Sequence, residues 1–89
     1  MLVLSRSEVE ELLDLDALSD ALARAHVELS AGKASLPPRI AAFAGNDGLL
    51  GAMPAYLPSA GLGCKLVSLF PHNIDQPTHQ AEIVIFDPE

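Results

Sequence analysis

Apolar residues in the first third of the chain recur at helical spacing. Separations of four, three and four positions put them on one face of an α-helix: Leu18, Leu22, Ala25 and Leu29. Asp14 or Asp16 can cap the start of this helix, and Gly32 offers the left-handed residue that ends it. We expect the helix to lay its apolar stripe on a sheet.

A shorter helix is predicted ahead of it. Ser5 and Glu8 have the spacing of a capping box, in which the serine hydroxyl accepts a hydrogen bond from the backbone of the third helical residue. The pattern predicts a helix over residues 6–13.

The second half of the chain changes to the pattern of extended strands. Pro37 and Pro38 stop helical continuation, and runs rich in Val, Ile, Leu and Phe follow. Asn46-Asp47-Gly48 tolerates positive φ and predicts a hairpin between the first two strands. The expected class is α+β, with two N-terminal helices packed on a mainly antiparallel β-sheet. The expected strands are residues 39–43, 49–56, 65–70 and 82–87.

Gly61-Leu62-Gly63 does not predict a dinucleotide-binding turn. A Rossmann fingerprint needs a third Gly or Ala where this chain has Leu66, and it must open a helix. Strand-forming residues follow here instead. The two glycines are therefore expected to be loop residues that lead into a strand.

Length and charge narrow the class of protein. The chain has 89 residues and a formal net charge of −7, so we expect one small domain over residues 1–89 and neither nucleic acid nor a membrane as partner. No apolar run approaches the roughly 20 residues of a membrane span, and no signal-peptide pattern opens the chain. A cytoplasmic protein is expected. Cys64 has no partner at metal-ligand spacing, so we predict no metal site and expect a small core residue there.

Arg39 and Lys65 are the only Lys or Arg residues in the strand-rich half. A guanidinium fork and a compact ammonium together suit the carboxylate of an amino or imino acid. The alternative is that Arg39 pairs with Asp47 or Glu82 on the surface, while Lys65 simply ends outside the sheet. The residues by themselves leave both interpretations open.

Four segments follow one another along the chain: Leu36-Pro37-Pro38-Arg39, Met53-Pro54-Ala55-Tyr56, Gly63-Cys64-Lys65-Leu66-Val67-Ser68 and Pro77-Thr78-His79-Gln80. In this order they resemble the N-terminal domain of the ornithine cyclodeaminase and mu-crystallin family, and the resemblance covers essentially the whole chain. After the His79-Gln80 pair the family often has Gly where this chain has Ala81 and Glu82, which is a departure in local backbone character.

The resemblance implies roles for three residues. The family's matching arginine and lysine bind the substrate carboxylate, which assigns that role to Arg39 and Lys65. Lys65 would also lie near the reacting carbon as the catalytic residue, and Thr78 would help to orient the substrate.

Four further residues are candidates with ordinary structural alternatives. His79 would serve as a proton donor or as a structural loop histidine, and Gln80 would bond the substrate or the backbone. Met53 and Tyr56 would line the pocket or form core.

The implied reaction is hydride transfer between a nicotinamide cofactor and the carbon that bears an amino or imino nitrogen. Cyclodeamination, ketimine reduction and alanine dehydrogenation all occur in the family. NAD(H) or NADP(H) would be bound mainly by a nucleotide-binding domain that these residues lack, so the chain is expected to be a truncated fragment that is inactive alone. Bare strand edges favour a homodimer. The alternatives are a stand-alone, non-enzymatic module for small-ligand binding or dimerisation, and a degenerate product with no specific activity.

Overall fold

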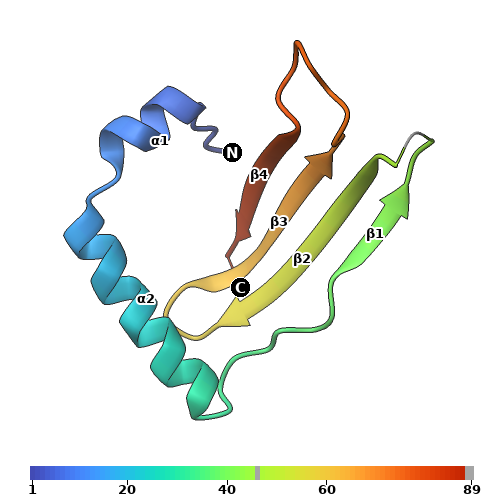
Figure 1. The fold of residues 1–89 in the computed structure, drawn as a ribbon. Helices are drawn as coiled ribbons and strands as arrows, with labels where there is room; N and C mark the ends of the chain where they lie inside the picture. Colours follow the sequence, from blue (N-terminus) through green and yellow to red (C-terminus); the bar gives the residue numbers. More distant parts are fainter. Residues whose placement is uncertain (46, 88–89) are drawn as a thin grey trace.

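Two helices precede a four-stranded sheet in the computed structural model, which describes residues 1–45 and 47–87 (Figure 1). The expected α+β class is confirmed. The elements are α1 (Arg6–Leu12), α2 (Leu15–Ser30), β1 (Ile40–Phe43), β2 (Leu49–Leu57), β3 (Gly61–Leu69) and β4 (His79–Phe86).

Side chains cap the start of both helices. The Ser5 hydroxyl accepts from the Glu8 backbone N–H at 3.2 Å, as the capping box predicts, and it donates to Glu8 Oε1 at 3.1 Å. Asp14, not Asp16, caps α2, because its carboxylate accepts from the N–H groups of Asp16 and Ala17 at 2.9 and 3.2 Å.

Gly32 ends α2 as predicted. Its φ of 74° is left-handed, and its N–H donates to the Leu29 carbonyl at 3.1 Å. The next N–H, of Lys33, donates to the Glu28 carbonyl at 3.0 Å. These two bonds form a Schellman motif, which satisfies carbonyls that the helix end leaves without partners.

The sheet is an antiparallel meander in the order β1-β2-β3-β4, so each strand pairs with its neighbour in sequence. The predicted hairpin between β1 and β2 is confirmed. Asn46 of its loop lies outside the described residues, and Asp47 has a φ of 62°, as expected for this turn. A Cβ at Gly48 would overlap the Phe70 ring, so this loop position requires glycine.

Two strands begin earlier than predicted. Gly61 and Gly63 are strand residues of β3, paired with Leu57 and Ala55 of β2, and their expected place in a loop is wrong. The two-stranded ladder continues through them because backbone pairing does not require a side chain.

β4 likewise begins at His79, although the sequence pattern puts its start at Glu82. The polar residues His79 and Gln80 pair with Leu69 and Ser68. An edge strand with exposed side chains accepts polar residues, so the ladder extends beyond the apolar run.

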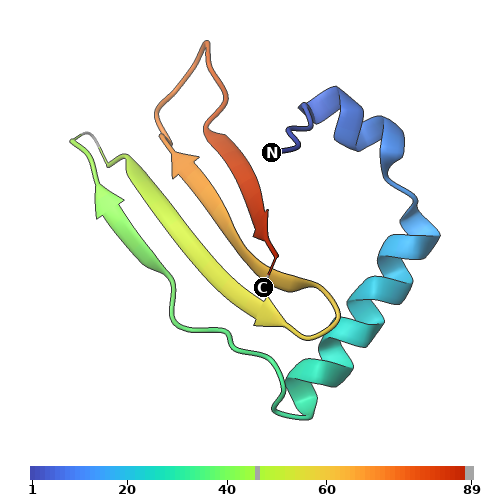
Figure 2. The ribbon, with the colours of Figure 1, turned by 180° about the vertical axis from the view of Figure 1, so that it is seen from behind.

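The helices stand to one side of the sheet (Figures 1 and 2). Of the described residues, α1 contacts no other helix or strand, and α2 contacts only β2. In addition, the hydroxyl of Ser59, in the turn after β2, donates a hydrogen bond to Glu28 Oε2 of α2 at 3.0 Å. Leu18, Leu22 and Leu29 are 37, 50 and 45% exposed. The expected burial of the α2 stripe on the sheet is therefore wrong for this chain, because the helix meets the sheet through its C-terminal end.

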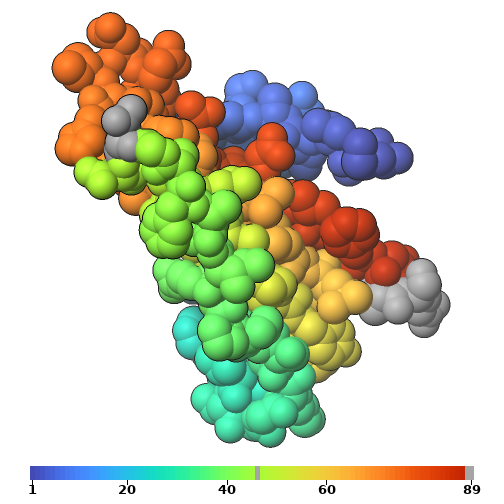
Figure 3. All heavy atoms as spheres, turned by 90° about the vertical axis from the view of Figure 1, so that its right-hand side faces the viewer, coloured from blue at the N-terminus to red at the C-terminus, as the bar shows by residue number. Residues whose placement is uncertain are grey.

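Figure 3 places the β3–β4 loop beside the tip of the β1–β2 hairpin at one end of the molecule, and the end of α2 at the opposite end. No hydrophobic side chain of the described residues is fully buried. No described helix is long and apolar enough to cross a membrane.

Candidate functional site

The strand register places three of the predicted site residues in one row across the sheet. Directly opposed residues of antiparallel strands share a face, and Lys65 lies opposite Met53 of β2 and Ile83 of β4. Arg39 immediately precedes β1, whose first pair is Ile40 with Ala52, so the register continues the row from Met53 to Arg39. We call Arg39, Met53, Lys65 and Ile83 the lysine row.

The two cations of the lysine row stand two strands apart. Neighbouring strands are about 4.8 Å apart, which puts the backbones of Arg39 and Lys65 roughly 10 Å from one another. Both side chains are exposed, and half-buried Met53 lies between them. Two long side chains at this separation can converge on one carboxylate from either side.

The sheet face that carries Lys65 is otherwise apolar. We call it the lysine face; it holds every second residue of each strand. Among the described strand residues of this face, Lys65 is the only Lys, Arg, Asp or Glu, and His79 lies at one end. The other strand residues of the face are Ala41, Phe43, Leu49, Gly51, Met53, Ala55, Leu57, Gly61, Gly63, Val67, Leu69, Ala81, Ile83 and Ile85.

Thr78 immediately precedes β4, away from the lysine row. Its carbonyl accepts from the Phe70 N–H at 2.8 Å, and its hydroxyl is hydrogen-bonded to His79 Nδ1 at 3.0 Å. It precedes Ile83 by five positions, and this spacing corresponds to about 17 Å along an extended strand. The structure therefore does not bring Thr78 directly beside Lys65.

Two other candidates belong to the opposite face. Gln80 pairs with Ser68, and Tyr56 pairs with Leu62. Ser68 and Leu62 are an odd number of positions from Lys65 along β3, so their side chains and those of their partners lie on the face opposite Lys65. Of the four additional candidates, Met53 alone lies in the lysine row.

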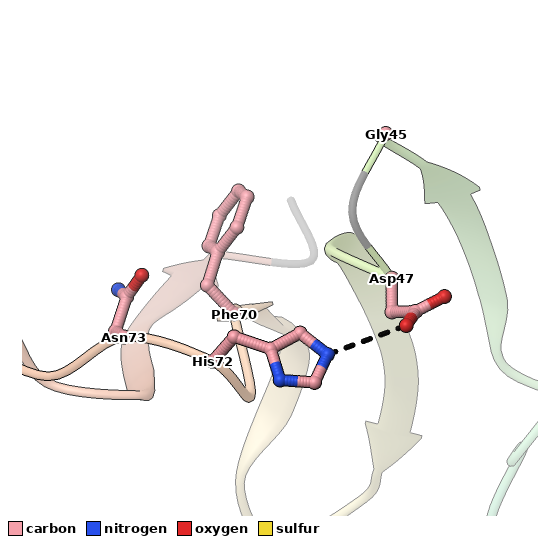
Figure 4. Close-up of a pocket in the computed structure, with 5 residues that line it drawn as sticks. All are labelled: Gly45, Asp47, Phe70, His72 and Asn73. Atoms are coloured by element: carbon pink, nitrogen blue, oxygen red, sulfur yellow. Dashed lines mark hydrogen bonds and ion pairs between the residues drawn. The ribbon is translucent and has the colours of Figure 1, made fainter.

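The predicted surface partners of Arg39 are engaged or turned away. Asp47 Oδ2 lies 3.3 Å from His72 Nε2, across two loops (Figure 4). Glu82 pairs with Leu66 on the opposite face. Among the described residues, Arg39 has no ion pair. The exposed guanidinium is thus available to a ligand.

Neither of two shallow hollows includes the lysine row's cations. The first, of about 450 Å³, lies between the two loops at the end of the sheet and is lined by Gly45, Asp47, Phe70, His72 and Asn73 (Figure 4). The second, of about 220 Å³, includes half-buried Cys64 and Tyr56. The lysine row is an open surface in this part of the molecule.

The described residues do not fit a nicotinamide dinucleotide. Gly61 and Gly63 lie within β3, and the chain after them continues as a strand instead of opening a helix. A pyrophosphate group needs the free N–H groups of a helix start after such glycines.

Sheet and helices together form an α+β domain in which Arg39 and Lys65 lie in one row across the sheet. Over residues 1–89 the sequence matches the Ornithine cyclodeaminase/mu-crystallin family, and the chain belongs to that family.

Two relatives cover nearly the whole chain. An alanine dehydrogenase of Archaeoglobus fulgidus is 36% identical over an alignment of 90 positions, which covers 99% of this chain and 27% of the relative. A solved archaeal structure, described as an alanine dehydrogenase dimer with bound NAD, has a TM-score of 0.89 and 33% identity over 99% of this chain and 28% of its own. The chain thus spans little more than a quarter of either relative.

Proposed function

We propose that this chain is the substrate-binding part of an ornithine cyclodeaminase-like, NAD(P)-dependent enzyme that acts on an amino or imino acid. The observation that carries the proposal is the lysine row, in which two unpaired cations flank Met53 on an apolar sheet face. Family membership and the alanine dehydrogenase relatives support the reaction class.

In this proposal Arg39 and Lys65 bind the substrate carboxylate and fix the position of the adjacent carbon. Arg39 donates two parallel hydrogen bonds, whereas Lys65 supplies a compact charge closer to the reacting carbon. Holding the carbon in one orientation contributes to the rate because the entropy of alignment is lost on binding. The role of Thr78 in orienting the same substrate stays a prediction, because Thr78 precedes Ile83 by about 17 Å along the strand direction.

NAD(H) or NADP(H), which would exchange the hydride, is proposed to be bound by a nucleotide-binding domain outside these 89 residues. The lengths of the two relatives support this division, since each is more than three times as long as the matched part. The chain alone is accordingly expected to be inactive.

Lys65→Ala in the protein at its natural length tests the proposal. We expect kcat/KM for amino acid oxidation to fall by about 100-fold or more, because a charge that orients the reacting group is lost. Lys33→Ala is the matched control, since Lys33 is an exposed lysine outside the sheet. Wild-type kinetics in Lys65→Ala would contradict the assignment.

A second candidate function is a non-enzymatic module for small-ligand binding or dimerisation. It is favoured by the lack of fit between the described residues and a dinucleotide. The intact mass of the protein from its native source distinguishes the two, because the enzyme requires a second domain.

A further inference from the structure

We propose that Asn73 is a positioning residue for the proposed reaction, and that it acts by holding Thr78 in place through the β3–β4 loop. The inference rests on the proposed function, because Thr78 is there predicted to orient the substrate. The contacts that support it lie within the loop, over residues 70–78 between the two strands.

The Asn73 side chain bridges the loop just ahead of Thr78. Its Nδ2 lies 3.1 Å from the Pro77 carbonyl oxygen, and because a carbonyl can only accept, the amide N–H donates. The Asn73 backbone N–H donates to the Phe70 carbonyl at 3.1 Å. Asn73 thus connects the first residue of the loop with the peptide group that leads into Thr78.

Thr78 is held from its other side as well. Its carbonyl accepts from the Phe70 N–H at 2.8 Å, and its hydroxyl is hydrogen-bonded to His79 Nδ1 at 3.0 Å. Thr78 is half-buried, whereas every other residue from 71 to 80 is exposed. The Pro77 carbonyl and the Thr78 nitrogen belong to one planar peptide group, so a rotation of that group would turn the Thr78 hydroxyl.

The start of the loop is attached to the β1–β2 hairpin by other residues. The Phe70 ring occupies the space where a Cβ of Gly48 would lie, and His72 Nε2 lies 3.3 Å from Asp47 Oδ2. In Figure 4 the His72 ring points toward Asp47, whereas the Asn73 amide points away from it. The hairpin contacts therefore fix where the loop starts, and Asn73 fixes where it ends.

Hydrogen–deuterium exchange of the natural-length protein tests the structural part. Asn73→Asp removes the amide donor at nearly constant side-chain size. Gln76→Glu is the matched control, because it makes the same charge change in the same loop and the Gln76 side chain has no hydrogen bond among the described residues. We expect the Phe70 amide to exchange about two- to tenfold faster in Asn73→Asp than in the control, the size of one lost hydrogen bond. Equal exchange rates would overturn the inference.

A double-mutant cycle with Thr78→Val tests whether Asn73 acts through Thr78. We expect Asn73→Asp to lower kcat by about tenfold at nearly constant KM, because the hydroxyl loses its alignment while Arg39 and Lys65 still bind the carboxylate. In the Thr78→Val background the same substitution should change kcat by less than about twofold. L-alanine and L-ornithine, each with NAD+, serve as substrates of the natural-length protein.

The outcomes separate the inference from the proposed function. Additive effects of the two substitutions would overturn the inference, because Asn73 would then act independently of Thr78. Wild-type kinetics in Thr78→Val would overturn it too, and would leave the assignment of Lys65 standing. Turnover of neither amino acid by the unmodified protein would overturn the proposed function, and the inference with it.

Asn73→Ala repeats both measurements should Asn73→Asp fail to fold. It removes the same donor without adding a charge, and Gln76→Ala is then its matched control. The expected differences in exchange and in kcat, and the results that would overturn the inference, stay the same.

Discussion

Lys65 and Arg39 differ in how the strands present them. Lys65 is in the middle of β3, with paired neighbours on both sides, whereas Arg39 precedes an edge strand. The backbone of Lys65 is therefore held by strand pairing on both sides, whereas the backbone of Arg39 is held only by its position next to the first pair of β1. We expect Lys65 to set the position of the substrate and Arg39 to contribute mainly to its affinity.

Arg39→Ala should raise KM more than it lowers kcat. A hydrogen bond to a charged group contributes about 1.5–3 kcal/mol, so KM should rise by about 10- to 100-fold. Arg24→Ala is the control, because Arg24 is an exposed arginine on α2. Steady-state kinetics decide the matter: a fall in kcat at constant KM would assign Arg39 to the chemical step instead.

At this scale the sequence predicted Arg39, Lys65 and Met53, which the register puts in one row, but it could not say which of the other candidates share their face. Met53 and Tyr56 are three positions apart in one strand, and alternation puts them on opposite faces. Gln80 is separated from Lys65 for the same reason, but that assignment requires the β3–β4 register, which depends on the length of the intervening loop. Ile83, directly opposite Lys65, was not predicted as a site residue, because its place also depends on the β3–β4 register.

Among the elements, β3 is the strand on which the site depends. It pairs along its length with β2 and β4, and it brings Gly63 against the neighbouring strand. A Cβ at Gly63 would lie 2.9 Å from Ile85 Cδ1 and 3.3 Å from the Val84 carbonyl oxygen. Glycine is thus favoured here because strand β4 of the same chain approaches closely.

Gly63→Ala should destabilise the protein by about 1–3 kcal/mol, the usual cost of overpacking. Gly45→Ala is the matched control, since a Cβ there would meet nothing within 4 Å. Chemical denaturation of the natural-length protein measures both. Equal stability of the two variants would show that Ile85 moves aside without cost.

Helix boundaries were predictable because caps are local. The hydroxyl of Ser5, the carboxylate of Asp14 and the φ of Gly32 each act within a few residues. Strand beginnings were less predictable, since a strand starts where its partner allows pairing. His79 joins β4 because Leu69 of β3 lies opposite, whatever its own polarity.

For the whole molecule, the main feature is the apolar surface that the described residues leave exposed. Phe43, Ile83 and Ile85 are 81, 70 and 65% exposed, and all three are on the lysine face. An apolar surface of this extent is typical of an interface. The solved relative is described as a dimer.

We expect the natural-length protein to elute as a dimer or larger assembly in size-exclusion chromatography with light scattering. Apolar contacts between exposed side chains and unpaired strand edges supply the attraction. Dilution over a hundredfold range provides the control for weak self-association. A monomer at the highest concentration would contradict the prediction.

The placement of the helices was beyond the sequence pattern. The spacing of Leu18, Leu22 and Leu29 correctly gave a helix with one apolar stripe, but it could not say which surface covers that stripe. Orientation depends on the connection from Ala31 to Arg39 and on what else packs there. Periodicity records only that a surface is apolar.

The meander order of the sheet has a consequence for synthesis on the ribosome. Each strand pairs only with its neighbours in sequence, so Arg39, Met53, Lys65 and Ile83 enter the row in the order of translation. Sheets with such local pairing assemble faster than those that wait for distant segments. All four residues of the lysine row can therefore come into register as soon as β4 has left the ribosomal exit tunnel.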